Sequence, residues 1–135
     1  MANEFLFIDT SAFYAFYDKR DANHNKISKL LQASDAEFTT SNYVLDELIT
    51  PLRVRNFQLK QIAPFVEALL NESICTILRV DKETDLKAWE LMNKYSDHDF
   101  SFTDCTSFVL MKKNRIKKVA TVDRHFKIAG FEILS

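Results

Sequence analysis

Short apolar runs of strand length alternate with amphipathic helical stretches along this sequence, and the alternation constrains the fold more than any other feature. The run FLFI at residues 5–8 stops at Asp9, and a helical period begins near Thr10 or Ser11. Such a continuous apolar run is typical of a strand covered by helices on both faces. No two-residue hairpin signal joins one run to the next. The pattern therefore predicts an α/β layer structure with a mostly parallel sheet.

The expected elements cover most of the chain. Strands are expected at residues 4–9, 37–41, 74–80, 119–122 and 131–134, and helices at 10–17, 27–34, 42–52, 58–72, 82–94 and 103–113. Pro51 lies inside an apolar helical pattern, so we expect a kink or a new helix start there. A length of 135 residues without a shift in composition predicts one domain, 1–135.

The composition removes several classes of function. The sequence holds a single glycine, Gly130, so neither a GxGxxG nor a GxxxxGK[ST] phosphate loop can be written in it. Cys75 and Cys105 lack CxxC-type spacing and are interpreted as buried apolar residues. No segment approaches the roughly 20 apolar residues of a membrane helix and no signal peptide is seen, so we expect a cytoplasmic protein without membrane contact. The net charge of -1 does not indicate a nucleic-acid binder, although a local basic patch would suffice for one.

Four acidic residues stand where an α/β fold collects its chemistry. Asp9 and Asp123 lie at the carboxyl ends of expected strands, the edge at which such sheets bind ligands. Glu47 interrupts an apolar helix face, and Asp104 lies in the first turn of a helix, where the dipole favours negative charge. Adjacent helix residues point about 100° apart, so we expect Glu47 rather than Asp46 to face the strand ends. Asp9 and Asp123 are equally open to interpretation as helix caps.

A cluster of these acids would need a positive charge within it. Carboxylates about 4 Å apart repel by roughly 4 kcal/mol per pair at an effective dielectric near 20. Oxygen ligands suit Mg2+ or Mn2+, whereas zinc favours cysteine and histidine, and the histidines at positions 24, 98 and 125 are scattered. We therefore expect the acids to hold Mg2+ or Mn2+, with Asp99 as a further candidate ligand. Such a site is suited to phosphodiester hydrolysis.

The acidic blocks, in this order, resemble the PIN-domain ribonucleases and especially the VapC-like toxins of prokaryotic toxin–antitoxin pairs. The blocks read IDTSAF, SNYVLDEL, SFTDCTSFVLM and ATVDRHFKIAGF, and the resemblance spans essentially the whole chain. It implies a three-layer α/β/α sandwich, Mg2+ or Mn2+ held by Asp9, Glu47, Asp104 and Asp123, and cleavage of single-stranded RNA. It also implies a homodimer and a protein antitoxin that inserts a segment near the active site.

Small polar residues near the acids have two interpretations. In the resembling family such residues orient the acids, which makes Ser11, Asn42 and Thr103 candidate supporting residues. Each of the three is also placed to cap a helix, and the two interpretations stand equally.

Basic residues outside the acidic blocks are candidates for RNA contact through phosphate groups. The candidates are Arg53, Arg55, Lys112 and Lys113, together with Lys19, Arg20 and the basic residues up to Lys118. The cations near the end of the last long helix also have a structural interpretation, because they complement the helix dipole.

Three functions other than a toxin nuclease stay open. One is a PIN-type RNA-processing nuclease with another biological role, and a second is a non-catalytic module that binds RNA or protein. The third is a phosphatase or phosphoacceptor domain with Asp9 as nucleophile. The absence of the pattern DxDx[TV] counts against the third function, because the second aspartate of the pattern would fall on position 11, which is Ser11.

Overall fold

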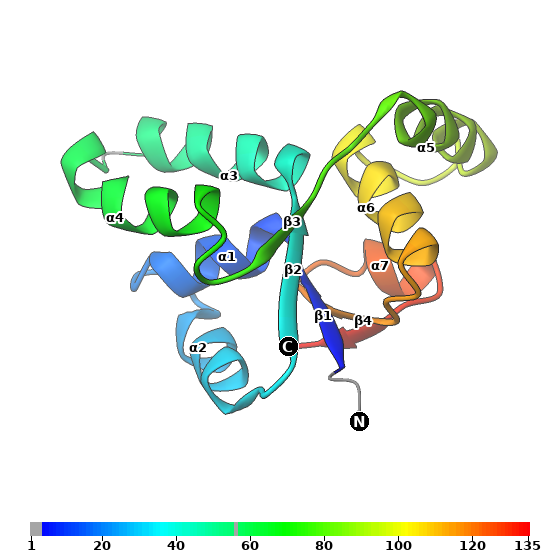
Figure 1. The fold of residues 1–135 in the computed structure, drawn as a ribbon. Coiled ribbons are helices and arrows are strands. Elements are labelled where there is room, and N and C mark those ends of the chain that lie inside the picture. The colour runs from blue at the N-terminus through cyan, green and yellow to red at the C-terminus, as the bar shows by residue number, and fades with distance from the viewer. Residues whose placement is uncertain (1–3, 56) are drawn as a thin grey trace.

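The chain folds around one five-stranded sheet in which every neighbouring pair of strands is parallel. The computed structural model describes residues 4–55 and 57–135. The strand order is β3-β2-β1-β4-β5 (Figure 1). The strands are β1 (Phe5–Ile8), β2 (Glu37–Ser41), β3 (Thr76–Leu78), β4 (Lys118–Ala120) and β5 (Glu132–Leu134). The helices are α1 (Thr10–Tyr17), α2 (His24–Ala33), α3 (Asn42–Val54), α4 (Leu59–Leu70), α5 (Lys82–Lys94), α6 (Phe102–Lys113) and α7 (His125–Ile128).

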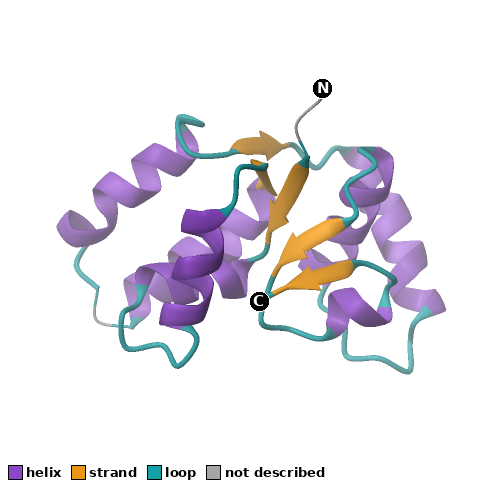
Figure 2. Cartoon of the chain, turned by 90° about the horizontal axis from the view of Figure 1, so that it is seen from below, coloured by secondary structure: helices purple, strands orange, loops and turns teal. Residues whose placement is uncertain are grey.

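Helices cover both faces of the sheet. Helices α1 to α4 lie on one side and α5 to α7 on the other (Figure 1), and the view from below shows the strands between two groups of helices (Figure 2). This arrangement confirms the expected three-layer α/β/α sandwich. Among the described residues, no helix is both long and apolar enough to span a bilayer.

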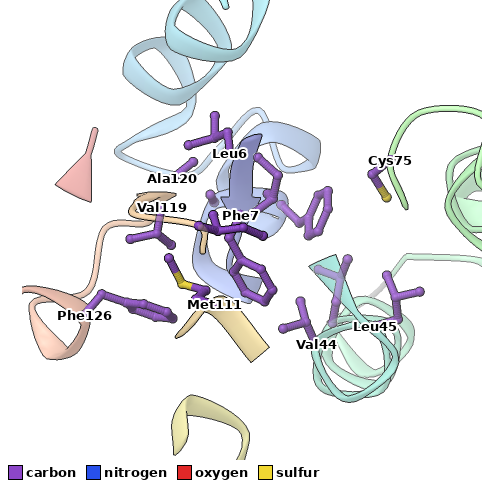
Figure 3. Close-up of a cluster of buried hydrophobic side chains, with 14 of the residues drawn as sticks. Leu6, Phe7, Val44, Leu45, Cys75, Met111, Val119, Ala120 and Phe126 are labelled. Carbon is purple, nitrogen blue, oxygen red and sulfur yellow. The ribbon is translucent and has the colours of Figure 1, made fainter. Parts of the chain in front are cut away.

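The central strand β1 supplies the middle of the core. Its residue Phe7 pairs in register with Thr39 of β2 and Val119 of β4. Its ring lies 6.5 Å from that of Phe126, and Met111 of α6 packs into the same cluster (Figure 3). The core therefore joins β1 to the helices that follow it much later in the chain. Both cysteines are free and buried, as expected.

The strand order fixes where the sheet can bind a ligand. From β1 the chain proceeds outward through β2 to β3, then returns to the other side of β1 with β4 and β5. The connections therefore reverse direction between β1 and β4, which makes the carboxyl ends of these two strands a topological switch point. Asp9 follows the end of β1, and Thr121 follows the end of β4.

Two corrections to the expected elements concern the surroundings of Asp123 and Glu47. Strand β4 ends at Ala120 rather than Val122, so Asp123 lies on the loop after the strand. Helix α3 continues through Pro51 to Val54, so a new helix start there is wrong. Pro51 has no N–H to offer to the carbonyl of Glu47 four residues earlier, and the helix tolerates that missing bond. Ser41 caps α3, since its hydroxyl accepts a hydrogen bond from the Val44 N–H at 3.1 Å.

Candidate active site

A cleft of about 290 Å³ lies at the switch point, and we call it the acidic cleft. It contains the four acids singled out in the sequence and one further aspartate. The residues lining it are Asp9, Thr10, Ser11, Tyr14, Asp21, Glu47, Pro51, Arg55, Asp104, Val122 and Asp123. Five carboxylates thus share one small cleft with a single cation, Arg55, among the lining residues that the structure describes.

Asp9 is the most enclosed of these acids, with 4% of its surface exposed. It occupies the N-cap position of α1, yet its side chain makes no capping hydrogen bond. Instead, its Oδ2 accepts hydrogen bonds from the hydroxyls of Thr121 at 2.9 Å and Ser11 at 3.1 Å. Burial raises the pKa of Asp9 to about 6, and the Thr121 hydroxyl only partly offsets this effect. The Asp9 side chain is therefore oriented by Ser11 and Thr121 at the cleft and does not cap α1.

The same two hydroxyls fix the loop after β4. Ser11 Oγ accepts the Val122 N–H at 3.1 Å, and Thr121 Oγ1 accepts the Asp123 N–H at 3.0 Å. The two hydroxyl oxygens also lie 3.0 Å from each other, so Asp9, Ser11 and Thr121 form one hydrogen-bonded network. Ser11 and Thr121 therefore connect the carboxylate of Asp9 to the backbone that carries Asp123.

Asp104 is 6% exposed and lies in the first turn of α6, where it takes part in a capping box. Its Oδ2 accepts the Ser101 N–H at 3.1 Å, and its own N–H donates to Ser101 Oγ at 2.9 Å. This reciprocal pair satisfies two helix-terminal donors and fixes the rotamer of the aspartate. The capping box therefore sets the direction in which Asp104 faces the cleft.

His125 lies between Asp104 and Asp123. Its Nδ1 is 2.8 Å from Asp104 Oδ2 and 3.2 Å from Asp123 Oδ2. Ionised carboxylates only accept hydrogen bonds, so the hydrogen-bond pattern assigns the proton to Nδ1. Burial lowers the pKa of His125, but the hydrogen bond to Asp104 and the charges of Asp123 and Asp104 outweigh burial and raise it above its ordinary value. His125 thus draws two acids together.

Glu47 and Asp21 complete the acidic wall. Glu47 is half-buried and lines the cleft, whereas its neighbour Asp46 is exposed and does not. Asp21 lies in the turn between α1 and α2, where its Oδ1 accepts the Asn23 N–H at 2.8 Å. Arg55 also lines the cleft, and its guanidinium lies 5.3 Å from the centre of the Tyr14 ring, a cation–π contact. Arg55 is therefore held over the cleft by an aromatic ring.

Several other residues singled out from the sequence lie outside the acidic cleft. Asp99 is exposed and does not line the cleft, although its charge helps to raise the pKa of His125. Asn42 accepts the Val80 N–H at 2.9 Å, which ties the start of α3 to the chain after β3. The Thr103 carbonyl accepts the hydroxyl of Thr106 within α6. Among the three supporting candidates, only Ser11 touches an acid of the cleft.

The basic candidates divide in the same way. Arg55 lines the acidic cleft, while Arg53 is exposed and lies outside it. Lys112 and Lys113 lie at the far end of α6, about 12 Å along the helix from Asp104. There they line a separate hollow between α5 and α6, and Lys113 is 3.9 Å from Asp81.

Three residues of this site are not predicted by the sequence. Thr121 lies two residues before Asp123 in the block that carries the resemblance, but its role depends on Asp9, 112 positions away. His125 lies two residues after Asp123, but the three histidines are scattered along the sequence and their spacing predicts no shared site. Asp21 lies in a polar turn without periodicity, and no local pattern distinguishes it from a solvated surface residue.

Comparison with known proteins places this geometry in context. The PIN domain model matches residues 6–132. The 23S rRNA-specific endonuclease VapC20 of Mycobacterium tuberculosis is 30% identical over 126 residues, which are 93% of this chain and 95% of that protein. Ribonuclease VapC26 of the same organism is 25% identical over 125 residues, covering 90% of this chain and 89% of that protein.

Solved structures agree with the sequence matches. The crystal structure of M. tuberculosis VapC20, described as a Sarcin-Ricin loop cleaving toxin, matches with a TM-score of 0.86 at 30% identity, over 93% of this chain and 95% of that chain. FitAcB from Neisseria gonorrhoeae matches with a TM-score of 0.70 at 15% identity, over 96% of both chains. At that identity the second match shows the fold alone.

Proposed function

The chain belongs to the PIN-domain family, and from that premise we propose that it is a Mg2+- or Mn2+-dependent endoribonuclease that hydrolyses phosphodiester bonds of single-stranded RNA. One observation carries the proposal: Asp9, Glu47, Asp104 and Asp123 come from four separate places in the chain and line one small cleft at the switch point of the sheet. A structural role for each acid alone would not require this convergence.

The residues of the cleft fit a divalent cation. One oxygen of Asp104, one of Asp123 and one ring nitrogen of His125 lie within 4.8 Å of one another. Thr10 Oγ1, in the same lining, is buried without a hydrogen-bond partner among the described residues. Carboxylate oxygens are the ligands that Mg2+ and Mn2+ prefer. We therefore assign the ion to Asp9, Asp104, Asp123 and Glu47.

A bound ion would supply Lewis-acid chemistry and positive charge for the carboxylates and the phosphate. The protein's own residues do the rest. Ser11 and Thr121 hold Asp9 in one orientation, and the capping box holds Asp104. His125 keeps Asp104 and Asp123 together. Arg55, over the Tyr14 ring, offers donors to a phosphate that enters the cleft.

The biological role belongs to the same proposal. VapC20 is named as an endonuclease specific for 23S rRNA and described as a toxin, so we propose that this chain is the toxin of a toxin–antitoxin pair acting on RNA in the cytoplasm. Its expected partners are a protein antitoxin and a second copy of the chain. A 23S rRNA fragment is accordingly included among the RNAs tested below.

Cleavage of end-labelled RNA tests the proposal. We expect the wild-type protein to cleave a single-stranded RNA or the 23S rRNA fragment in Mg2+ or Mn2+, and to lose this activity in EDTA. Glu47→Gln should lower the rate at least tenfold, because it removes one charged ligand. Asp46→Asn is the matched control, since this neighbouring acid on the same helix is exposed and should leave the rate unchanged.

Three outcomes would contradict the proposal. Intact RNA with retained binding would indicate a non-catalytic module, and equal losses in the two variants would indicate that the acids act only through stability. Release of phosphate from a phosphomonoester, with RNA left intact, would point instead to a phosphatase.

A further inference from the structure

We propose that a hollow beside the acidic cleft binds a nucleotide next to the scissile phosphate, with its base stacked on the guanidinium plane of Arg20. The hollow has a volume of about 360 Å³ and we call it the Arg20 hollow. Its lining consists of Tyr17, Asp18, Lys19, Arg20, Phe57 and Gln61. The inference deepens the proposed function, on whose RNA substrate it rests.

The Arg20 hollow continues from the acidic cleft. Three segments of the chain contribute residues to both the cleft and the hollow: α1, the turn after it and the connection from α3 to α4. In each segment a residue of the cleft and a residue of the hollow lie one to three positions apart, so a strand whose phosphate sits among the acids passes the hollow next. The pairs, cleft residue first, are Tyr14 and Tyr17, Asp21 and Arg20, and Arg55 and Phe57.

Arg20 is exposed to solvent and nevertheless held in place. Its side chain is 70% exposed, while the Asp18 side chain is 9% exposed. Asp18 Oδ1 accepts hydrogen bonds from Arg20 Nε at 3.1 Å and from the Arg20 N–H at 3.0 Å. The guanidinium lies 5.3 Å from the centre of the Phe57 ring. Much of the side-chain entropy that binding would remove is therefore already lost in the free protein.

The aromatic backing of Arg20 is firm. Phe57 meets Tyr17 edge to face at 5.2 Å, and Tyr17 stacks on Phe65 at 5.1 Å. The Tyr17 hydroxyl donates to the Gln61 carbonyl at 3.0 Å, which fixes the ring. Nucleic acid bases stack on aromatic rings and on guanidinium planes, and this recognition tolerates any base.

Charge favours RNA over a protein segment as the occupant. Lys19 is exposed at the rim of the hollow, and the guanidinium of Arg20 retains outward donors beyond its bond to Asp18. Both cations complement the phosphates of a strand that enters the acidic cleft. The hollow therefore combines a stacking plane with charges that suit the backbone on either side of a base.

The test compares two ligands of equal charge by fluorescence anisotropy. One is a labelled eight-nucleotide single-stranded RNA, and the other is an abasic strand with the same number of phosphates. The buffer contains Ca2+ in place of Mg2+, and the RNA length is checked on a gel after each titration. We expect Arg20→Lys and Phe57→Leu to weaken RNA binding about tenfold while changing the abasic strand by less than twofold, since lysine keeps the charge without the plane.

Further variants separate stacking from general damage. Arg20→Gln should weaken both ligands, because it removes the charge as well. Phe57→Trp should retain the preference for RNA over the abasic strand, because it keeps a ring behind Arg20. Phe5 begins β1 and Arg115 lies shortly before β4, so both are at the amino ends of the strands, away from the acidic cleft. Arg115→Lys and Phe5→Leu are therefore matched controls and should change neither ligand.

The inference is overturned if Phe57→Leu weakens both ligands equally or neither, or if the wild-type protein shows no saturable RNA binding. If the hollow binds a protein partner instead of RNA, Phe57→Leu should change the affinity for neither ligand. Cleavage by the wild-type protein in Mg2+ is scored separately. Cleavage without base discrimination overturns only the nucleotide site, whereas base discrimination without cleavage overturns only the proposed nuclease.

Discussion

Asp9 stands where its burial costs stability and where the proposed function requires a carboxylate. Its carboxylate is buried, its pKa is raised to about 6, and its charged form has no cation beside it among the described residues. Burial disfavours the ionised state and a bound divalent ion would favour it. Binding of the proposed ion would therefore stabilise the fold through this residue.

Asp9→Asn should stabilise the metal-free protein at neutral pH. Because the folded pKa of about 6 lies above the ordinary 3.8, the protonated form stabilises the fold below about pH 4, and this contribution disappears as pH rises through 6. The difference between the folded and the ordinary pKa of Asp9 corresponds to about 3 kcal/mol of unfolding free energy at pH 7.5, which Asp9→Asn should recover. Urea unfolding in EDTA at pH 7.5 and pH 4 measures it, and the gain should vanish at pH 4.

Thr121 permits a second test on the same network. Thr121→Val removes the donor to Asp9 and the acceptor for the Asp123 N–H, so we expect cleavage to fall at least tenfold and the free energy of unfolding to drop by about 1–3 kcal/mol. Thr106→Val is the control: it is equally buried, but its hydroxyl bonds a carbonyl within α6. Equal loss of activity in both variants would argue against a positioning role for Thr121.

Among the elements, α6 begins with a capping box whose second member, Asp104, is also a proposed metal ligand. Ser101→Ala should cost about 1 kcal/mol in unfolding free energy, because the Asp104 N–H loses its acceptor Ser101 Oγ. The Ser101 N–H still reaches Asp104 Oδ2, so any loss of cleavage should be modest and should come from a looser first turn of α6. Asp81→Ala removes a comparable cap from α5, away from the acidic cleft. It should destabilise by a similar amount and leave the cleavage rate per folded molecule unchanged. Chemical denaturation and RNA cleavage, measured on the same samples, decide between the two effects.

The elements also show what the sequence can and cannot predict. The apolar run that stops at Asp9 and the apolar face that surrounds Glu47 are local patterns, so both residues could be singled out before their positions were known. Strand β4 has only three residues, too few for a sequence pattern to mark where it ends, so the sequence predicts Asp123 directly after a strand. The bonds between Thr121 and Asp9 join residues 112 positions apart, and no periodicity encodes such a contact.

At the scale of the whole molecule, the proposed function requires a chain of net charge -1 to bind a polyanion beside five carboxylates. A general positive field cannot provide the attraction, so it has to come from a few cations near the cleft. The structure places Arg55 in the acidic cleft and Lys19 with Arg20 in the Arg20 hollow. Lys112 and Lys113 lie in a different hollow, between α5 and α6.

RNA binding should therefore depend only weakly on salt. Single-stranded nucleic acid gives a slope of about -0.7 in log K against log salt for each neutralised phosphate, so three cations predict a slope near -2. Lys19→Gln should reduce the magnitude of the slope by roughly 0.7, and the double variant Lys112→Gln, Lys113→Gln should leave it unchanged. Anisotropy titrations between 50 and 300 mM KCl measure these slopes. A larger change in the double variant would mean that the RNA follows α6 rather than the turn between α1 and α2.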